Sequence, residues 1–139
     1  MLLLPKQYKF KSMFIRKKIN INNTSNSNFN LGSQSLFSLE SGRISSKEIE
    51  SVRKYLRLNL RKESKIWITI FPSNIITKKP QETRMGKGKG YLKYWAHFLK
   101  TNDILFQTKG LTSKYLSIKK ALNGACYKLS VISNVFAKI

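Results

Sequence analysis

The stretch SSKEIESVRKYLRLNLRKESKIWITIF, residues 45–71, indicates the fold class because its apolar pattern changes partway along it. In the first half, apolar residues recur at the spacing of one helix face, at Ile49, Val52, Leu56 and Leu60. Ser45 and Glu48 have the spacing of a capping box, in which each side chain satisfies a free backbone N–H at the helix start. In the second half, apolar residues alternate as in a strand, at Ile66, Ile68 and Ile70. The stretch therefore predicts a helix that starts near Ser45 and a strand over residues 65–71.

Two more strand-like runs follow, at residues 94–100 and 104–108. The short polar link between them, Thr101-Asn102-Asp103, is typical of a hairpin. A last strand is expected at residues 131–136. These runs bring the expected number of strands to about four.

A second helix is expected over residues 113–127. Its apolar stripe continues beyond the helix and comprises Ile118, Leu122, Ala125 and Leu129. Gly124 costs this helix about 1 kcal/mol relative to Ala, which suggests close packing against a neighbouring element. Helices and strands that interleave unevenly are typical of an α+β fold. We expect a two-layer sandwich, with two helices packed on one mixed or antiparallel sheet.

The first 41 residues differ in composition from the rest of the chain. Residues 1–39 contain no acid, and residues 20–35 are so rich in Asn and Ser that they cannot bury enough apolar surface to fold alone. We therefore expect a basic N-terminal arm and polar linker over residues 1–41, followed by one α+β domain over residues 42–139. An absence of acids is also typical of organelle targeting peptides, and that alternative stays open at this point.

The chain is strongly basic, with 27 Lys and Arg residues against 6 acids and a formal net charge of +21. An isolated globule would repel itself at this charge, so a polyanionic partner is expected. The cations are spread along the whole chain, which favours a protein surrounded by nucleic acid over a binder with one basic patch. Cations on the first helix, such as Arg53 and Arg57, are interpreted as phosphate contacts, with a solvated helix face as the alternative.

Residues 78–90, KKPQETRMGKGKG, form the strongest functional motif. They contain five cations and the single acid Glu82, and three glycines alternate with two lysines at their end. Glycine allows the backbone to lie close to a partner, and lysine adds a mobile positive charge. Known nucleotide-binding loops have other glycine spacings and precede a helix, whereas a strand is expected here. The motif predicts a basic loop that contacts a phosphate-rich surface.

No catalytic constellation or metal site is recognisable, and we expect neither an enzyme nor a cofactor. The single cysteine, Cys126, is expected to be a buried apolar side chain, and the single histidine, His97, a structural one. Trp67 and Phe71 can stack on RNA bases, but core packing is favoured for them. No apolar run approaches the roughly 20 residues that span a bilayer, so no membrane insertion is expected.

Residues 65–95, KIWITIFPSNIITKKPQETRMGKGKGYLKYW, resemble the bacterial-type large-subunit ribosomal protein family L-sixteen. That family has a strand of the form KIWIRVFP, a loop with KP and RMGKGKG, and a Tyr-Trp strand. Thr69 stands where the family usually has arginine. The likeness continues on both sides, for example at Gly42-Arg43-Ile44 and at ILFQTKG, residues 104–110. It is weakest over residues 12–41, where the family has a Gly- and Arg-rich segment.

The resemblance implies a hammerhead-like α+β domain that packs on large-subunit rRNA beside the aminoacyl-tRNA site, contacts neighbouring large-subunit proteins and is not a catalyst. The residues expected to bind rRNA are Lys6, Lys9, Lys11, Arg16, Lys17, Lys18, Arg43, Arg53, Arg57, Arg61 and Lys62. The loop expected to lie near tRNA comprises Lys78, Lys79, Arg84, Met85, Gly86, Lys87, Gly88, Lys89 and Gly90.

The likeness starts near Pro5, which leaves no room for a removable presequence. Together with a Lys, Asn, Ile and Ser bias typical of A+T-rich genomes, this suggests a mitochondrially encoded subunit in the mitochondrial matrix. A plastid or a bacterial cytoplasm is the alternative location.

Two other functions stay open. One is a free-standing RNA-binding assembly or chaperone factor, and the other is a cationic membrane-active protein, which the lack of a long basic amphipathic helix disfavours.

Overall fold

The computed structural model describes residues 3–5, 31–60, 64–86, 88–110 and 115–137. Its elements follow in the order β1 (Gln34–Ser38), β2 (Gly42–Ser45), α1 (Ser46–Leu60), β3 (Lys65–Ile68), β4 (Asn74–Lys78), β5 (Tyr91–Leu99), β6 (Ile104–Lys109), α2 (Tyr115–Cys126) and β7 (Ser133–Ala137).

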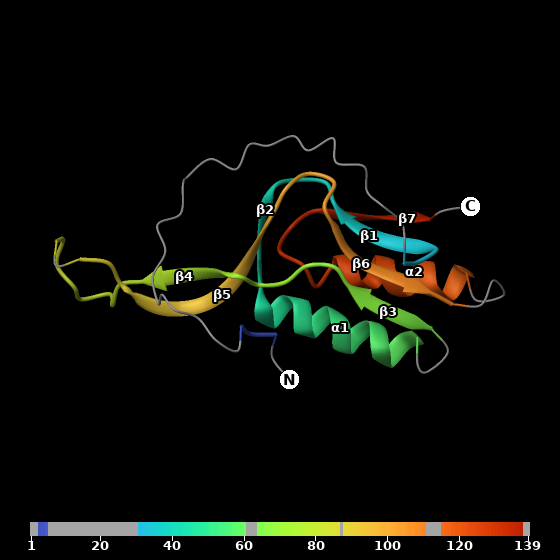
Figure 1. Ribbon diagram of the computed structural model, residues 1–139, viewed down its shortest axis with the longest axis horizontal. Coiled ribbons are helices and arrows are strands. Elements are labelled where there is room, and N and C mark those ends of the chain that lie inside the picture. The colour runs from blue at the N-terminus through green and yellow to red at the C-terminus, as the bar shows by residue number, and fades with distance from the viewer. Residues whose placement is uncertain (1–2, 6–30, 61–63, 87, 111–114, 138–139) are drawn as a thin grey trace.

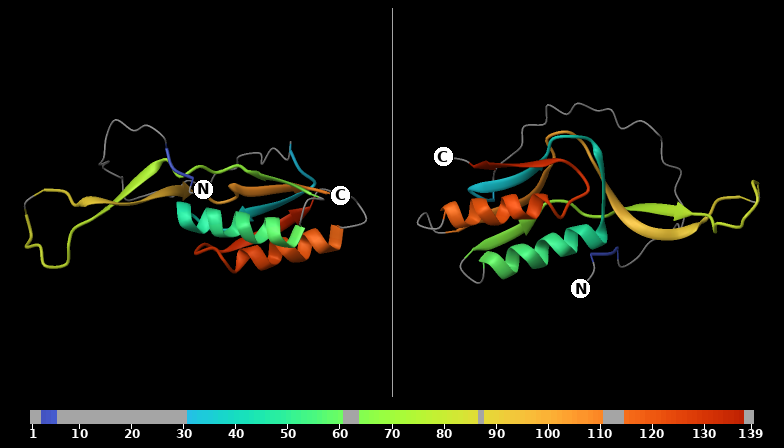
Figure 2. Two further views of the ribbon diagram at one scale, coloured as in Figure 1. Left: turned by 90° about the horizontal axis from the view of Figure 1, so that it is seen from below. Right: turned by 180° about the vertical axis from the view of Figure 1, so that it is seen from behind.

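The strands form two antiparallel sheets (Figure 1). One has four strands in the order β3-β6-β1-β7, and the other has three in the order β2-β5-β4. Both helices lie on one face of the four-stranded sheet and form a separate layer, which the views from below and behind show (Figure 2). The predicted α+β fold, with two helices packed on a sheet, is confirmed. The strands are more numerous than expected and are divided between two sheets.

The core lies between the helices and the four-stranded sheet. Leu36 of β1 and Phe106 of β6 are partners across the sheet, and both are fully buried. The predicted stripe of α1 faces them, with buried side chains at Ile49, Val52, Leu56 and Leu60. Burial of each such side chain contributes about 1.5–3 kcal/mol to the stability of the fold. This interface therefore holds the helices on the four-stranded sheet.

The start of α1 has the predicted capping box. The Ser45 backbone N–H donates to Glu48 Oε2 at 3.0 Å, and the Glu48 backbone N–H donates to Ser45 Oγ at 3.3 Å. Two donors that the helix leaves unpaired are therefore satisfied reciprocally.

The predicted close packing at Gly124 is also present. A β-carbon on this residue of α2 would lie 2.2 Å from the hydroxyl oxygen of Tyr55 on α1. The Lys128 ammonium lies 4.9 Å from the centroid of the same Tyr55 ring. Gly124 thus allows the two helices to approach with the tyrosine ring between them.

Strand β1 was not predicted, and its residues lie partly in the stretch 20–35 that was interpreted as a loop or linker. It is an inner strand of the four-stranded sheet, between β6 and β7. Its polar side chains obscured the pattern: Gln34 is buried and donates from Nε2 to the Tyr115 carbonyl oxygen at 3.0 Å. Strands β2 and β4 were not predicted either, because each is short and lies next to a stronger signal.

The hairpin predicted across residues 101–103 is wrong. A turn does occur there, with Asn102 at a φ of 64°, but β5 and β6 belong to different sheets. The connection from β1 to β2 also passes between the sheets. Ser38 ties the two connections together, because its hydroxyl donates to the Lys100 carbonyl oxygen at 2.7 Å and its own carbonyl accepts from the Asn102 N–H at 2.8 Å.

The strand predicted over residues 65–71 ends earlier, at Ile68. Ile66 and Ile68 pack against the core as expected. The aromatic side chains do not: Trp67 is half-buried, and Phe71 is 44% exposed, so the preference for core packing is wrong for Phe71. Phe71 lies between the end of β3 and the start of β4, so it is outside the alternation of either strand.

Candidate nucleic-acid interface

Strands β4 and β5 form a hairpin that projects from the body of the molecule, at the end away from α2 (Figure 1). Near the body, Ile75 pairs with Trp95 and both are buried, so this part of the hairpin is firmly held. At the outer end, Lys78 pairs with Tyr91 and both are exposed. The predicted basic loop is the tip of this hairpin, with Lys78 as the last residue of β4.

The glycines of the loop serve two purposes. Gly86 and Gly88 have φ values of 95° and 79°, in the left-handed region that favours glycine, and a β-carbon on either would meet nothing within 4 Å. A β-carbon on Gly90, in contrast, would lie 2.5 Å from the carbonyl carbon and oxygen of Lys78. The first two glycines therefore shape the tip, and Gly90 allows the chains to approach at its neck.

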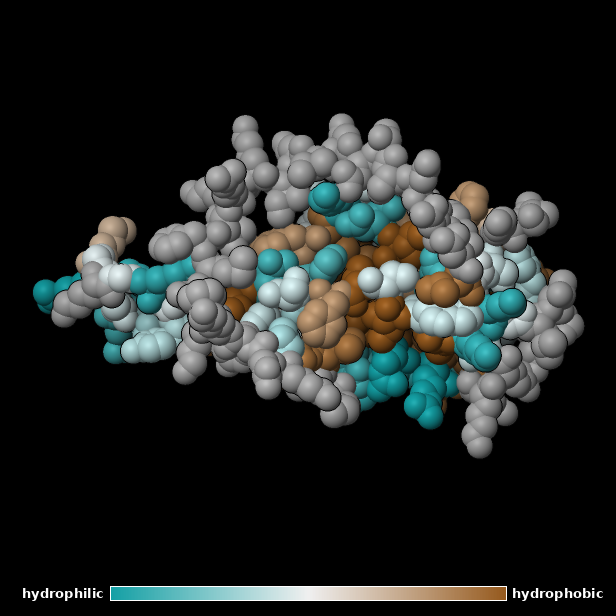
Figure 3. All heavy atoms as spheres, viewed as in Figure 1, coloured by the Kyte–Doolittle hydropathy of each residue, from teal (hydrophilic) through white to brown (hydrophobic). Residues whose placement is uncertain are grey.

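Side chains of the loop divide between internal contacts and exposure. Lys79 Nζ donates to the Gly86 carbonyl oxygen at 2.6 Å, which folds the loop back on itself. Arg84 and Met85 are exposed, and Met85 is completely so. The space-filling view shows a mainly hydrophilic surface at this end of the molecule (Figure 3). The tip thus exposes the guanidinium of Arg84 and the flexible apolar side chain of Met85 to a binding partner.

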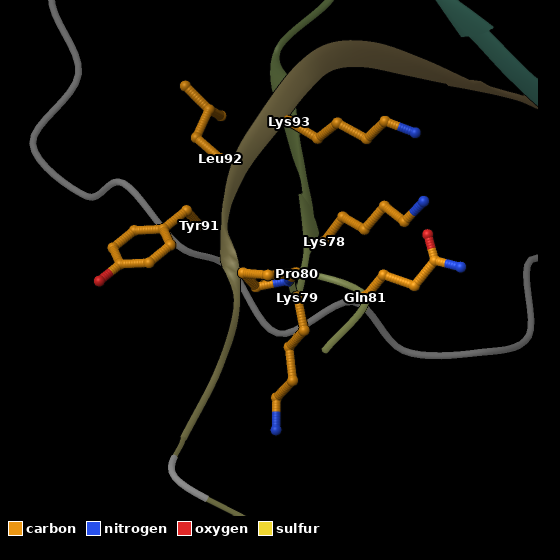
Figure 4. A pocket seen from close by; sticks show the side chains of 7 residues that line it. All are labelled: Lys78, Lys79, Pro80, Gln81, Tyr91, Leu92 and Lys93. Carbon is orange, nitrogen blue, oxygen red and sulfur yellow. The ribbon is translucent and has the colours of Figure 1, made fainter. Parts of the chain in front are cut away.

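An open pocket of about 370 Å³ lies behind the tip, lined by residues 78–81 and 91–93 (Figure 4). Three of its side chains are lysines: Lys78, Lys79 and Lys93. Lys93, Gln81 and Tyr91 were not among the predicted site residues. Gln81 lies inside the predicted loop, and Tyr91 and Lys93 follow it in the next strand. Only the structure shows that Tyr91 pairs with Lys78 and that Gln81 and Lys93 line the same pocket.

Arg53, one of the cations of the body that were predicted to bind rRNA, has an intramolecular partner. It donates from Nε to Glu50 Oε2 at 2.9 Å and from Nη2 to Glu50 Oε1 at 2.7 Å. The hydrogen bond from Arg53 lowers the pKa of the buried Glu50 to about 2, and Glu50 in turn raises the pKa of Arg53. Arg43 on β2 and Arg57 on α1 are exposed.

Nine of the predicted contact residues lie outside the described ranges. They are Lys6, Lys9, Lys11, Arg16, Lys17, Lys18, Arg61, Lys62 and Lys87. The predicted contact residues that the structure describes lie partly in the hairpin and partly in the body. In the body, Arg43 and Arg57 are the exposed ones.

His97 and Cys126 have structural surroundings. His97 Nδ1 lies 2.8 Å from the Phe71 carbonyl oxygen, which can only accept, so this nitrogen donates. Cys126 is half-buried, packs against the core and donates from Sγ to the Leu122 carbonyl oxygen at 3.4 Å.

Among the described residues, no group of three or more His, Cys, Asp or Glu side chains is placed to hold a metal ion. Neither α1 nor α2 has the length and apolar character of a membrane-crossing helix.

The sequence of residues 5–136 matches the family described as Ribosomal protein L16p/L10e. This match includes both sheets, both helices and the projecting hairpin. The chain belongs to the L16p/L10e family of ribosomal proteins.

Bacterial relatives named large ribosomal subunit protein uL16 agree with this assignment. The protein of Wigglesworthia glossinidia brevipalpis is 41% identical over 106 residues, which are 76% of each chain. That of Buchnera aphidicola subsp. Cinara cedri is 37% identical over 81% of this chain and 82% of the relative. That of Sphingopyxis alaskensis is 34% identical over 99% of this chain and 94% of the relative. The resemblance to the L-sixteen family is thereby confirmed.

Proposed function

We propose that this chain is a structural component of the large ribosomal subunit, that it binds large-subunit rRNA, and that it helps to organise the aminoacyl-tRNA site. The observation that carries the proposal is the family match over nearly the whole chain, together with a projecting hairpin whose tip is basic and rich in glycine. The role is that of a scaffold and not of an enzyme.

The body of the domain supplies the rRNA contacts in this proposal. Arg43 and Arg57 are exposed and can reach phosphates, whose neutralisation lets rRNA helices pack closely. Arg53 keeps further N–H groups beyond those bound to Glu50, but its charge is already balanced. We therefore rank it below the other two. The basic residues between Lys6 and Lys18 add contacts through the N-terminal segment.

The tip of the hairpin supplies the tRNA-facing contacts. Arg84 can bind a phosphate through two N–H groups at once, which a lysine cannot. Gly86 and Gly88 leave open space where side chains would otherwise stand, so the backbone can lie close to a tRNA. Lys87 and Lys89 add positive charge between the glycines. Neighbouring large-subunit proteins complete the set of partners.

Localisation follows from assembly into a ribosome. The Lys, Asn, Ile and Ser bias supports the mitochondrial matrix, and the relatives named above are bacterial proteins. A mitochondrial ribosome is therefore our proposal for the compartment, and a plastid or bacterial ribosome is the alternative.

The proposal is tested with large subunits depleted of this protein. Adding back the full chain should restore both its occupancy in the subunit and the binding of aminoacyl-tRNA. A free-standing RNA-binding assembly or chaperone factor would instead leave the assembled subunit, so tRNA binding would persist after its removal by washing. Stable occupancy without any gain in aminoacyl-tRNA binding would overturn the tRNA part of the proposal.

A further inference from the structure

The hairpin is chemically different at its tip and at its neck, where the outer ends of β4 and β5 meet at Lys78 and Tyr91. At the neck, the side chains of Lys78, Gln81 and Lys93 extend in the same direction, away from Tyr91 and Leu92 (Figure 4). We propose that Lys78, Gln81 and Lys93 form a separate binding site for the phosphates of an RNA strand at the neck of the hairpin. This inference rests on the proposed function and deepens it.

The pairing of β4 with β5 explains how Lys93 comes to this site. The register changes between Ile76, which pairs with Tyr94, and Thr77, which pairs with Leu92, so Lys93 has no partner on β4. Such a bulge inserts one extra residue and turns its side chain to a new direction. The Lys93 ammonium lies 5.9 Å from the centroid of the Tyr94 ring, within the range of a cation–π contact.

The charges at the neck are available for a ligand. In the described part of the chain, neither Lys78 nor Lys93 forms an ion pair with a carboxylate. Lys79 differs, because its ammonium is bound to the Gly86 carbonyl oxygen inside the loop. Two ammonium groups and the Gln81 amide are all hydrogen-bond donors, and phosphate oxygens are acceptors. The set therefore fits a polyanion with closely spaced acceptors.

RNA fits this site better than an acidic protein segment. The neck continues directly into the tip, which we assign to tRNA, so one nucleic-acid surface can cover both. Tyr91 lines the same pocket, is 84% exposed and extends to the opposite side of the hairpin (Figure 4). An RNA strand that passes around the neck can therefore stack a nucleobase on the Tyr91 ring while its phosphates contact the lysines.

The test measures how binding depends on salt. The full chain is titrated with oligouridine over a series of KCl concentrations, and log K is plotted against log[KCl]. Each lysine that contacts a phosphate contributes about 0.7 to the slope for a single strand. The variant Lys78→Gln/Lys93→Gln should therefore lower the slope by about 1.4, twice that value. Lys78→Arg/Lys93→Arg should retain the wild-type slope, because it keeps both charges.

The matched control is Lys119→Gln/Lys120→Gln, which removes two exposed charges from α2, far from the hairpin. An unchanged slope for this control, together with the lower slope of Lys78→Gln/Lys93→Gln, supports the site. Equal slopes in both variants would overturn it, and so would an equal loss when polyglutamate replaces the RNA. If wild-type chain binds no RNA at any salt concentration, the proposed function itself fails, which separates the two outcomes.

Discussion

Gly90 lies so close to the backbone of Lys78 that a β-carbon on residue 90 would be 2.5 Å from the Lys78 carbonyl carbon. Real β-carbons do not approach backbone atoms this closely, and backbone cannot give way as the end of a side chain can. The absence of a side chain at Gly90 therefore allows the two strands to lie close together at the neck of the hairpin. A β-carbon on Gly86, at the tip, would meet nothing within 4 Å, so this position needs glycine only for its φ of 95°.

Gly90→Ala is expected to push β4 and β5 apart at the neck. Amide hydrogen exchange in Asn74–Lys78 and in the facing end of β5 should become faster than in the wild type, because the last strand pairs open. Gly86→Ala is the control. It costs about 1–2 kcal/mol of local strain in the loop but should leave exchange in the strands unchanged. Identical exchange of β4 in Gly90→Ala and wild type would contradict this account of the neck.

Gly124→Ala is expected to lower the free energy of unfolding by up to about 2 kcal/mol. Overlap of the added methyl group with Tyr55 costs about 1–3 kcal/mol, and the better helix propensity of Ala offsets about 1 kcal/mol of it. Urea denaturation of the purified chain measures the change. In a Tyr55→Phe background the hydroxyl at 2.2 Å is gone and the nearest ring atom is 3.0 Å away, so the same substitution should cost less. A cost that is the same in both backgrounds would show that the tyrosine hydroxyl is not the obstacle.

Glu50→Gln is expected to lower the free energy of unfolding by about 1–3 kcal/mol near neutral pH, because it removes a charged hydrogen-bond partner of Arg53. The pKa of Glu50 is lowered from 4.5 to about 2, so its carboxylate is favoured by the folded state. This stabilisation is fully present above about pH 4.5 and is lost as the pH falls towards 2. The difference between wild type and variant should shrink over that window. A difference that does not vary between pH 7 and about pH 2 would contradict the assignment.

Arg43→Ala/Arg57→Ala is expected to weaken incorporation into the large subunit while leaving the fold intact, because both side chains are exposed. Occupancy in salt-washed subunits measures the effect. Arg53→Ala is the comparison, and it should reduce the stability of the free chain because the buried Glu50 loses its two hydrogen bonds from Arg53. Wild-type occupancy of the double variant would remove Arg43 and Arg57 from the rRNA contacts.

Lys87→Ala/Lys89→Ala is expected to slow aminoacyl-tRNA accommodation more than it reduces subunit assembly. The reason is position: both residues belong to the tip of the hairpin, beyond the strands that fix it to the body. Single-turnover accommodation and subunit occupancy are measured on the same particles. Normal accommodation at full occupancy would show that these lysines do not face tRNA.

The helices and the basic loop were predictable because their signals are local. The stripe from Ile49 to Leu60 and the capping box of Ser45 and Glu48 each occupy a few neighbouring positions. The low helix propensity of Gly124 predicted a close contact at this position, although only the structure shows that the neighbour is Tyr55.

The sheet topology was not predictable in the same way, because strand partners are distant in sequence. Polar Gln34 and Ser35 make β1 look like a linker, yet both are buried between β6 and β7. The turn at Asn102 has the composition of a hairpin, but it passes between two sheets. For the same reason, the meeting of Lys93 with Lys78 depends on a bulge that no local pattern reveals.

Sedimentation of this chain in a gentle lysate of its own cells or organelles tests whether it is a component of the large ribosomal subunit. We predict that it sediments with large ribosomal subunits at low salt and is released progressively as the salt concentration rises, because its contacts with rRNA are mainly ionic. Recovery of the chain only in slowly sedimenting fractions, with large subunits intact and free of it, would contradict the account.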